Sequence, residues 1–201
     1  MPQTPAPGDF ATTCRIGTRG SDLALWQAHT IQRLLGELGT VAELEIIKTK
    51  GDKIDDVPLA KLEGKGFFTK ELEDALLAGR VDLAVHSLKD LSTEMPDGLA
   101  LVAMVGREDA REMLLVRKEA VDQARLARGE ALPLKDAARL GTSAARRQAQ
   151  VRLLRPDVQI VDLRGNVPTR VNRLREGRYD AILLACAGLK RLELDLSDLF
   201  T

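Results

Sequence analysis

The stretch VDLAVHSLKD, residues Val81–Asp90, decides how the rest of the chain is interpreted. Its first half is a short apolar run, which is typical of a buried β-strand. Its second half places an imidazole, a hydroxyl, an ammonium and a carboxylate within five residues, on His86, Ser87, Lys89 and Asp90. In open α/β sheets, ligands bind at the carboxyl ends of the strands. The stretch therefore predicts a strand that ends at a functional site in an α/β fold.

Strands and helices alternate on both sides of this stretch. Short apolar runs predict strands at 14–18, 43–50, 81–86, 99–105, 139–143, 158–166 and 179–189. Amphipathic runs predict helices at 22–39, 69–80, 144–156 and 167–178. Thr69 and Gly79 are the expected cap and end of the second helix, and Pro168 the expected opening of the last. This alternation favours an α/β fold with mainly parallel sheets.

Two lobes are expected along the chain. The join near residues 105–111 is the expected boundary, which gives a first α/β lobe at 14–105 and a second at 106–201. Residues 1–13 are rich in Pro, Thr and Ala and are expected to form a loose tail.

Composition excludes several classes of protein. The chain has 201 residues, of which 44% are hydrophobic and 30% charged, so it is globular in type. Only 3% are aromatic, so the core must be aliphatic, with Trp26 expected inside it. Thirty acidic and thirty basic residues give zero net charge, which argues against nucleic-acid or membrane partners. Cys14 and Cys186 suggest no disulfide framework and no metal site, and a reducing cytoplasm is the expected location. Cys186 is expected to be a buried residue within a strand.

A pair of arginines opposes the dipole of a predicted helix. Thr142 and Ser143 link a strand to that helix, and Ser143 is the expected N-cap. The amino end of a helix attracts anions, so a cation there is disfavoured by about 0.3–1 kcal/mol. Arg146 and Arg147 nevertheless occupy the first turn. Their placement predicts a bound anion.

The excess of arginine continues through the second lobe. Residues 139–178 contain ten arginines, three acidic residues and no lysine. Arginine binds carboxylate or phosphate through two parallel hydrogen bonds, which lysine cannot do. Arg164 follows a second strand, so two strand ends present arginine. These features predict a ligand with several carboxylates or phosphates. The arginines within the helices, Arg152, Arg155, Arg173, Arg175 and Arg178, are expected to be solvated.

Several motifs together resemble the porphobilinogen deaminase (hydroxymethylbilane synthase) family. They are IGTRGSDLALWQA, KTKGDKI, PLAKLEGKGFFTKELEDALLAGRVDLAVHSLKDL, GREDARE, LGTSAARRQAQ, LRGNVPTRVNRL and YDAILLACAGLKRL, in that order. The resemblance implies two lobes of the type II periplasmic-binding-protein kind, with a cleft between them and a third, smaller domain. It implies a transferase of tetrapyrrole and heme biosynthesis, which condenses four porphobilinogen units with release of ammonia.

The resemblance also implies roles for particular residues. Asp90 matches the catalytic aspartate of the family. The residues that match substrate- or cofactor-binding positions are Arg19, Ser21, Lys65, Ser87, Lys89, Thr142, Ser143, Arg146, Arg147, Arg164, Arg170 and Arg191. The expected cofactor is a dipyrromethane, which the family holds by a thioether to a cysteine of its third domain. The expected partners are porphobilinogen and linear pyrrole intermediates.

The chain departs from the family after its second lobe. It ends at Thr201, and neither Cys14 nor Cys186 matches the cofactor cysteine. Three interpretations stay open: part of a longer enzyme, a truncated homologue, or one component beside a separately encoded third domain. The family is usually monomeric, but without the segment that completes its first lobe this chain is a candidate dimer. The alternative function is a non-catalytic two-lobed module that binds a polycarboxylated small molecule.

Overall fold

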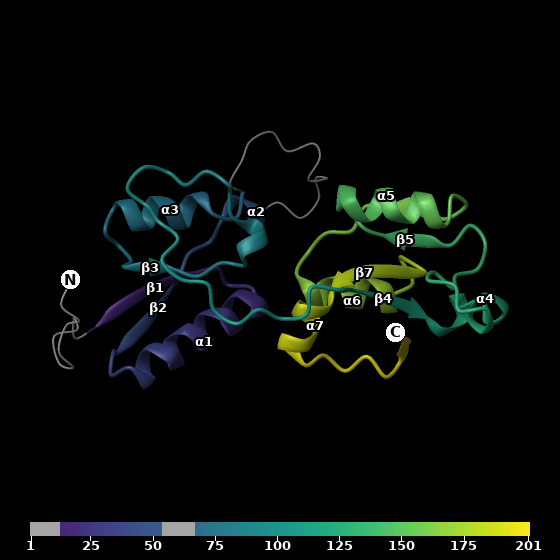
Figure 1. Ribbon diagram of the computed structural model, residues 1–201, viewed down its shortest axis with the longest axis horizontal. Helices are drawn as coiled ribbons and strands as arrows, with labels where there is room; N and C mark the ends of the chain where they lie inside the picture. Colours follow the sequence, from purple (N-terminus) through teal and green to yellow (C-terminus); the bar gives the residue numbers. More distant parts are fainter. Residues whose placement is uncertain (1–12, 54–66) are drawn as a thin grey trace, which may run out of the picture. The chain divides into compact units, whose positions relative to one another are not determined.

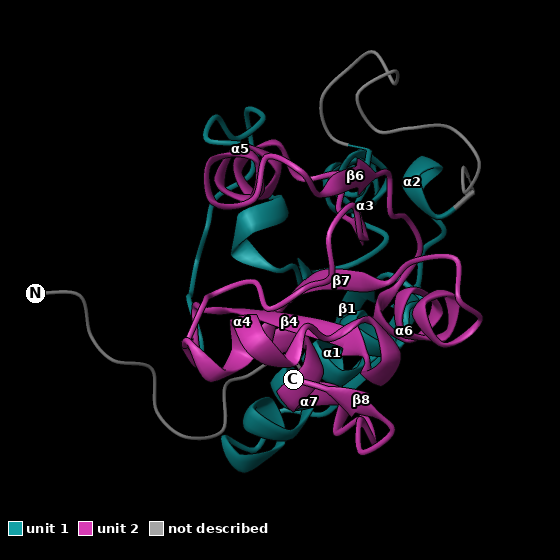
Figure 2. Cartoon of the chain, turned by 90° about the vertical axis from the view of Figure 1, so that its right-hand side faces the viewer, with its two compact units in different colours: residues 1–54, 64–105 teal, residues 55–63, 106–201 magenta. Residues whose placement is uncertain are grey.

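The computed structural model describes residues 13–53 and 67–201, which divide into two compact units. Unit 1 contains 13–53 and 67–105, and unit 2 contains 106–201 (Figure 2). Most of the predicted N-terminal tail lies outside the described residues. Among the described residues, no helix is both long and apolar enough to cross a membrane.

Unit 1 is a three-stranded parallel sheet with helices on both faces. Its elements are β1 (Cys14–Thr18), α1 (Asp22–Glu37), β2 (Ala42–Ile46), α2 (Lys50–Lys53), α3 (Lys70–Leu77), β3 (Leu83–Ala84) and the 3₁₀ helix η2 (Leu88–Asp90). The strand order is β2-β1-β3, and both pairs are parallel. Figure 1 shows α1 and α3 on opposite faces of this sheet.

Alternation along β1 explains the packing on the two faces of the sheet in unit 1. Ile16 is fully buried in a cluster with Ala28 of α1 and Ala42 of β2. The next residue, Gly17, faces the other side, where an added Cβ would lie 3.1 Å from Val81 Cγ2. Glycine therefore lets the segment below α3 approach the sheet closely.

An ion pair joins β1 to the start of the β3 segment. The Arg15 backbone N–H donates to Asp82 Oδ2 at 2.8 Å, and its Nη2 donates to Asp82 Oδ1 at 2.8 Å. The Asp82 N–H donates in turn to the Arg15 carbonyl at 2.9 Å. These hydrogen bonds from Arg15 lower the pKa of Asp82 to about 2.

Unit 2 is a five-stranded mixed sheet. Its elements are β4 (Glu112–Arg117), the 3₁₀ helix η3 (Lys118–Ala120), α4 (Gln123–Ala127), β5 (Arg139–Gly141), α5 (Ala145–Leu154), β6 (Gln159–Val161), α6 (Val167–Arg175), β7 (Ala181–Ala185), α7 (Cys186–Leu192) and β8 (Leu199–Phe200). The order is β6-β5-β7-β4-β8. β5 pairs in parallel with β6 and β7, whereas β4 is antiparallel to β7 and β8. The predicted α/β class with mainly parallel sheets is confirmed.

The two faces of this second sheet have separate cores. Val116 and Ala181 pack with Val151 of α5 on one face. Their sequence neighbours Leu115 and Ile182 pack with helices α6 and α7 on the other. The period of two along each strand thus produces the three layers.

Three sequence predictions are wrong: one concerns a strand, one the burial of a side chain and one the element that holds a cysteine. Residues 99–105 form no strand, and Val102 in this segment is 86% exposed. An apolar run becomes a strand only where a neighbour supplies hydrogen bonds, and no described strand pairs with it. Trp26 is 39% exposed rather than in the core. Cys186 is buried as expected, but it opens helix α7 instead of lying within a strand.

Helix caps follow the sequence only in part. Asn166 caps α6, since its side chain accepts from the Thr169 N–H, and proline lies in the first turn as predicted. The residue that precedes α5 is Ala144, so Ser143 is not its N-cap. Thr69 precedes α3 but makes no side-chain capping hydrogen bond. The predicted cap position is therefore confirmed for Thr69 and wrong for Ser143.

The prediction that Arg155 is a solvated helix residue is wrong, because its side chain is buried and hydrogen-bonded within the protein. It is 5% exposed and follows α5 directly. Its Nη1 donates to the carbonyls of Leu132 and Leu134 at 2.8 and 2.9 Å, and its Nη2 pairs with Asp157 Oδ2 at 2.7 Å. Arg155 thus connects the end of α5 to the loop around Leu134, which forms an isolated β-bridge with Val121.

Substitution Arg155→Met should destabilise the protein by about 3 kcal/mol, because it removes a buried guanidinium that donates to two carbonyls and one carboxylate. Urea unfolding measures this loss. Arg152→Met, at an exposed position of the same helix, is the matched control and should change stability little. Equal effects of the two substitutions would contradict the assignment.

The ion pair of Asp82 should make stability depend on pH. The pKa of Asp82 in the folded protein, about 2, lies below its ordinary value of 3.8. Its contribution is therefore present above about pH 4 and disappears as the pH falls through about 2. The difference in free energy of unfolding between wild type and Asp82→Asn should shrink over that range. A difference that stays constant from about pH 4 to about pH 2 would count against this ion pair.

Candidate functional site

The three parallel strands of unit 1 end at one edge of the sheet. Arg19 and Ser21 follow β1, Asp52 follows β2, and the segment 85–90 follows β3. Because parallel strands share a direction, their carboxyl ends gather on the same side. The polar cluster that ends VDLAVHSLKD is thereby brought beside residues more than sixty positions earlier in the chain.

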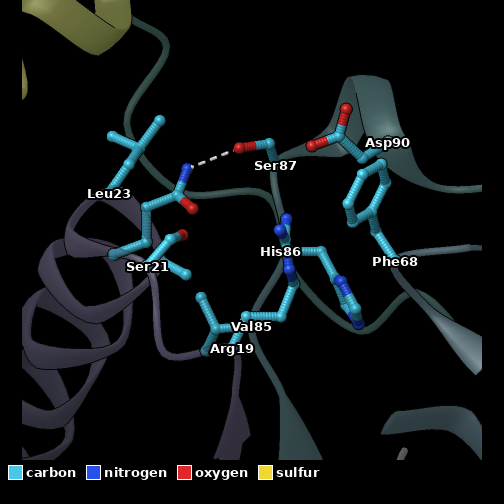
Figure 3. Close-up of a pocket in the computed structure, with 10 residues that line it drawn as sticks. Arg19, Ser21, Leu23, Phe68, Val85, His86, Ser87 and Asp90 are labelled. Atoms are coloured by element: carbon cyan, nitrogen blue, oxygen red, sulfur yellow. Dashed lines mark hydrogen bonds between the residues drawn. The ribbon is translucent and has the colours of Figure 1, made fainter. Parts of the chain in front are cut away.

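A pocket opens at this edge, and Figure 3 shows the side chains that line it. They are Arg19, Ser21, Leu23, Ala24, Gln27, Phe68, Val85, His86, Ser87 and Asp90. Gln27 of helix α1 donates from Nε2 to the Ser87 hydroxyl at 2.8 Å. This hydrogen bond holds the side chain of Ser87, the residue that precedes the η2 turn.

Asp90 lies at the end of η2, a single turn that begins after Ser87. The turn is closed by the Asp90 N–H, which donates to the Ser87 carbonyl at 2.9 Å. Asp90 is exposed to solvent and contributes to the lining of the pocket. The turn therefore presents a carboxylate at the pocket mouth, where it can accept N–H groups of a ligand or stabilise a cation.

His86 supplies a neutral ring beside that carboxylate. Burial lowers the pKa of His86, against the opposing effects of the Glu73 and Asp90 carboxylates. The imidazole is therefore uncharged near pH 7. In this state His86 does not compete as a cation for the carboxylate of Asp90.

Arg19 is held by a carboxylate and by an aromatic ring. Its guanidinium is ion-paired with Asp52, and its Cζ lies 4.3 Å from the centroid of the Phe68 ring. Burial opposes ionisation of Asp52, but hydrogen bonds from Arg19 and Thr49 outweigh it and lower its pKa. An added Cβ at Gly51 would lie 2.2 Å from the Phe68 ring, so glycine is required there. Helix α2 thus positions two pocket side chains without lining the pocket.

The second set of predicted residues gathers at one edge of unit 2. The carboxyl ends of β5, β6 and β7 meet there because these strands are parallel. The Ser143 hydroxyl links the first two loops: it donates to Leu163 O at 3.1 Å and accepts from Leu163 N at 3.0 Å. Thr142 is 1% exposed, and its hydroxyl accepts from the Ala144 N–H at 3.3 Å. These hydroxyls are already engaged within the protein.

The arginine pair of α5 meets a carboxylate of the chain itself. Arg147 Nη2 lies 2.5 Å from Glu112 Oε2, and Arg146 Nη2 lies 3.5 Å from Glu112 Oε1. The two arginines occupy the first turn, as expected. Their opposition to the helix dipole therefore does not by itself demand an external anion, because Glu112 supplies a negative charge.

Arg164 differs from that pair because no carboxylate among the described residues forms an ion pair with it. The residue is 8% exposed, and its buried Nη1 has no hydrogen-bond partner among the described residues. Nearby, Arg170 donates from Nε to the Gly165 carbonyl at 2.6 Å. Arg191, at the end of α7, donates from Nη2 to the Gly106 carbonyl at 3.2 Å. A buried guanidinium nitrogen without an acceptor is costly unless a ligand supplies one.

The predicted residues are thus distributed over two edges. Arg19, Ser21, Ser87 and Asp90 share the pocket of unit 1, whereas Lys89 is exposed on η2 and does not line it. Lys65 lies outside the described residues. The remaining predictions lie on unit 2 in the loops or helices after β5, β6 and β7.

Four neighbours of the predicted residues were missed from the sequence. They are Gln27, Asp52 and Phe68 in unit 1 and Glu112 in unit 2. Gln27 is a polar residue one turn after Leu23 on a helix that follows the first strand. A polar residue so close to a strand end could have been predicted as part of the site. The pairing of Asp52 with Arg19 and of Glu112 with Arg147 spans more than thirty residues, so no local pattern reveals it.

Comparison with known proteins identifies relatives over nearly the whole chain. Residues 14–199 match the family model described as "Porphobilinogen deaminase, dipyromethane cofactor binding domain". The porphobilinogen deaminase of Nitratiruptor sp. is 54% identical over 88% of this chain and 54% of the relative. That of Sulfurimonas denitrificans is 52% identical over 89% of this chain and 55% of the relative.

One solved structure is similar at a greater distance. The periplasmic VFT2 domain of Bordetella pertussis BvgS is 13% identical, and the match covers 89% of this chain and 68% of that chain with a TM-score of 0.48. The assignment depends on the sequence matches and not on this likeness. The chain spans about half the length of the curated relatives it matches. With 54% and 52% identity to named relatives and a family model that covers residues 14–199, this chain belongs to the porphobilinogen deaminase family.

Proposed function

We propose that this chain supplies the catalytic aspartate and the carboxylate-binding arginines of a porphobilinogen deaminase (hydroxymethylbilane synthase). Such an enzyme joins four porphobilinogen units stepwise into hydroxymethylbilane. In each step the bond from the aminomethyl carbon to nitrogen breaks and ammonia leaves. That carbon then bonds to the free ring carbon of the terminal pyrrole of the growing chain, which loses a proton, and water supplies the hydroxyl group of the released product. The observation that carries the proposal is the Asp90 carboxylate at a strand end, lining the pocket with Arg19 and Phe68.

Asp90 suits the charge that develops in this chemistry. Loss of ammonia leaves a pyrrole cation with an acidic N–H, and a carboxylate can accept that N–H and stabilise the positive charge. The aromatic ring of Phe68 offers a face on which a planar pyrrole can stack. His86 stays neutral near pH 7, so the full negative charge of Asp90 is available to the cation.

The arginines suit the side chains of porphobilinogen, which bears an acetate and a propionate. Arg19 lines the pocket of unit 1, and Arg164 keeps a buried nitrogen without an acceptor in unit 2. Within this proposal they bind ligand carboxylates together with Arg146, Arg147, Arg170 and Arg191. Ser21 and Ser87 contact the ligand in the pocket beside Asp90, and Lys89 contacts the part of it that extends beyond the pocket, while Thr142 and Ser143 shape the loop after β5.

The dipyrromethane cofactor fits these arginines but not the thiols of the chain. It carries carboxylates, to which the unpartnered Nη1 of Arg164 can donate a hydrogen bond. Cys186 is 5% exposed, and burial together with Asp82 raises the pKa of Cys14. A thioether needs an accessible, ionisable thiol, so neither cysteine suits the attachment. When bound, the cofactor supplies a tethered pyrrole end for elongation.

The state of the cysteines bears on location. Cys14 and Cys186 are both free thiols. Free thiols are the usual state in a reducing compartment, so within this proposal the protein works in the cytoplasm.

Asp90→Asn tests the catalytic assignment in the complete gene product. Turnover of porphobilinogen should fall by about 100-fold or more, because the neutral amide cannot stabilise the cation. The protein should stay folded and should keep its affinity for porphobilinogen within about tenfold. Asp97→Asn, an exposed residue of the same unit, is the matched control. If the wild type shows no turnover and Asp90→Asn changes only the affinity for porphobilinogen, the binding module is favoured instead.

Arg164→Met tests the carboxylate site through two quantities, the free energy of unfolding without ligand and the affinity for porphobilinogen. Without ligand, the substitution should raise the free energy of unfolding by about 1 kcal/mol, because it removes a buried charge that lacks an acceptor. Affinity for porphobilinogen should fall about tenfold or more. Calorimetry measures both quantities. Arg178→Met, which removes an exposed arginine of the same unit, should change neither, and a parallel loss in that variant would contradict the assignment.

A further inference from the structure

Glu112 lies between the two arginines that open helix α5. Its Oε2 is 2.5 Å from Arg147 Nη2, and its Oε1 is 3.5 Å from Arg146 Nη2. One carboxylate of the chain therefore faces both members of a pair that is otherwise suited to an external anion. Glu112 is the last residue of the GREDARE motif, to which the resemblance assigns no binding role.

The antiparallel strand β4 accounts for this position. Glu112 is the first residue of β4 and pairs in register with Ala185, the last residue of β7. The amino end of β4 consequently reaches the edge where the loops after the parallel strands β5, β6 and β7 gather. An all-parallel sheet would place the carboxyl end of this strand there instead.

The two arginines depend on Glu112 to different degrees. Arg147 has a side chain that is 12% exposed, and its Nη1 also donates to the Leu183 carbonyl at 3.0 Å. Its Nε is buried without a partner among the described residues. Arg146 has a side chain that is 81% exposed, and among the described residues it makes only the longer contact with Glu112. Removal of the negative charge should therefore leave Arg147 in place and leave both cations free for another anion.

We propose that Glu112 is a specificity-determining residue, an internal counter-ion with which each ligand carboxylate must compete at this arginine pair. This inference rests on the proposed function. A ligand carboxylate near Arg146 and Arg147 gains their attraction but meets repulsion from Glu112. The competition weakens the preference of the site for charged ligands over neutral ones. In an enzyme that elongates a densely carboxylated product, weak binding at this pair lets each carboxylate leave as the product grows.

The test compares charged and neutral pyrroles in the full chain. Glu112→Gln keeps the side-chain shape and removes the charge. Its affinity for porphobilinogen, measured by titration calorimetry, should rise about tenfold. Its affinity for the dimethyl ester of porphobilinogen should not change. If Glu112 had a merely structural role, its substitution would not tighten binding. It would also not change the affinity for porphobilinogen relative to the affinity for the ester.

Glu119→Gln is the matched control. It also removes one carboxylate from an arginine ion pair of unit 2, with Arg117, beyond the opposite end of β4. An equal gain in that variant would show a general effect of net charge and would overturn the inference. If Glu112→Gln fails to fold, Glu112→Asp withdraws the carboxylate by one methylene and should give a smaller gain of the same sign.

The outcomes separate the two proposals. If wild type binds porphobilinogen and Glu112→Gln binds it no more tightly, the inference about Glu112 is wrong while the proposed function stands. If wild type binds neither porphobilinogen nor its ester, the proposed function fails. In the complete gene product, Glu112→Gln should lower KM and kcat together, because tighter binding slows release. An unchanged KM would contradict the inference.

Discussion

The shared direction of parallel strands is the constraint on which the site depends. In unit 1 it brings Arg19, Asp52 and Asp90 to one sheet edge, although they follow three different strands. In unit 2 it gathers the loops after β5, β6 and β7. The antiparallel β4 then adds Glu112 from its amino end. A sheet with another order of strands would place the same residues far apart.

Charge at these edges is balanced inside the chain rather than left to solvent. Arg19 is paired with Asp52, and Arg147 with Glu112. Such pairing lowers the cost of holding half-buried guanidinium groups when no ligand is bound. Arg164 is the contrast, because no described carboxylate forms an ion pair with it and its buried Nη1 has no acceptor among the described residues. The described part of the protein thus combines arginines whose charge is already balanced with Arg164, for which we propose a ligand anion.

The residues that we propose for catalysis and for binding differ in how they are held. Asp90 is exposed on a single turn, and the chain fixes it through its backbone and through the hydrogen bond from Gln27 to Ser87. The side chain of Arg19 is instead held directly, by the ion pair with Asp52 and by the ring of Phe68. A carboxylate that meets a transient cation benefits from solvent-side access, whereas a cation that orients a ligand benefits from rigidity.

Local pattern in the sequence was enough to predict the α/β class, most helices, and the strand ends that hold Arg19, Asp90 and Arg164. These features follow from periodicity and from the order of elements, which are properties of neighbouring residues. Only the tertiary structure decided that residues 99–105 form no strand, that Trp26 is exposed and that Arg155 is buried. It alone revealed Glu112 beside Arg147, thirty-five residues away. Strand partners, burial and ion pairs depend on residues distant in the chain, so they are set by packing rather than by local sequence.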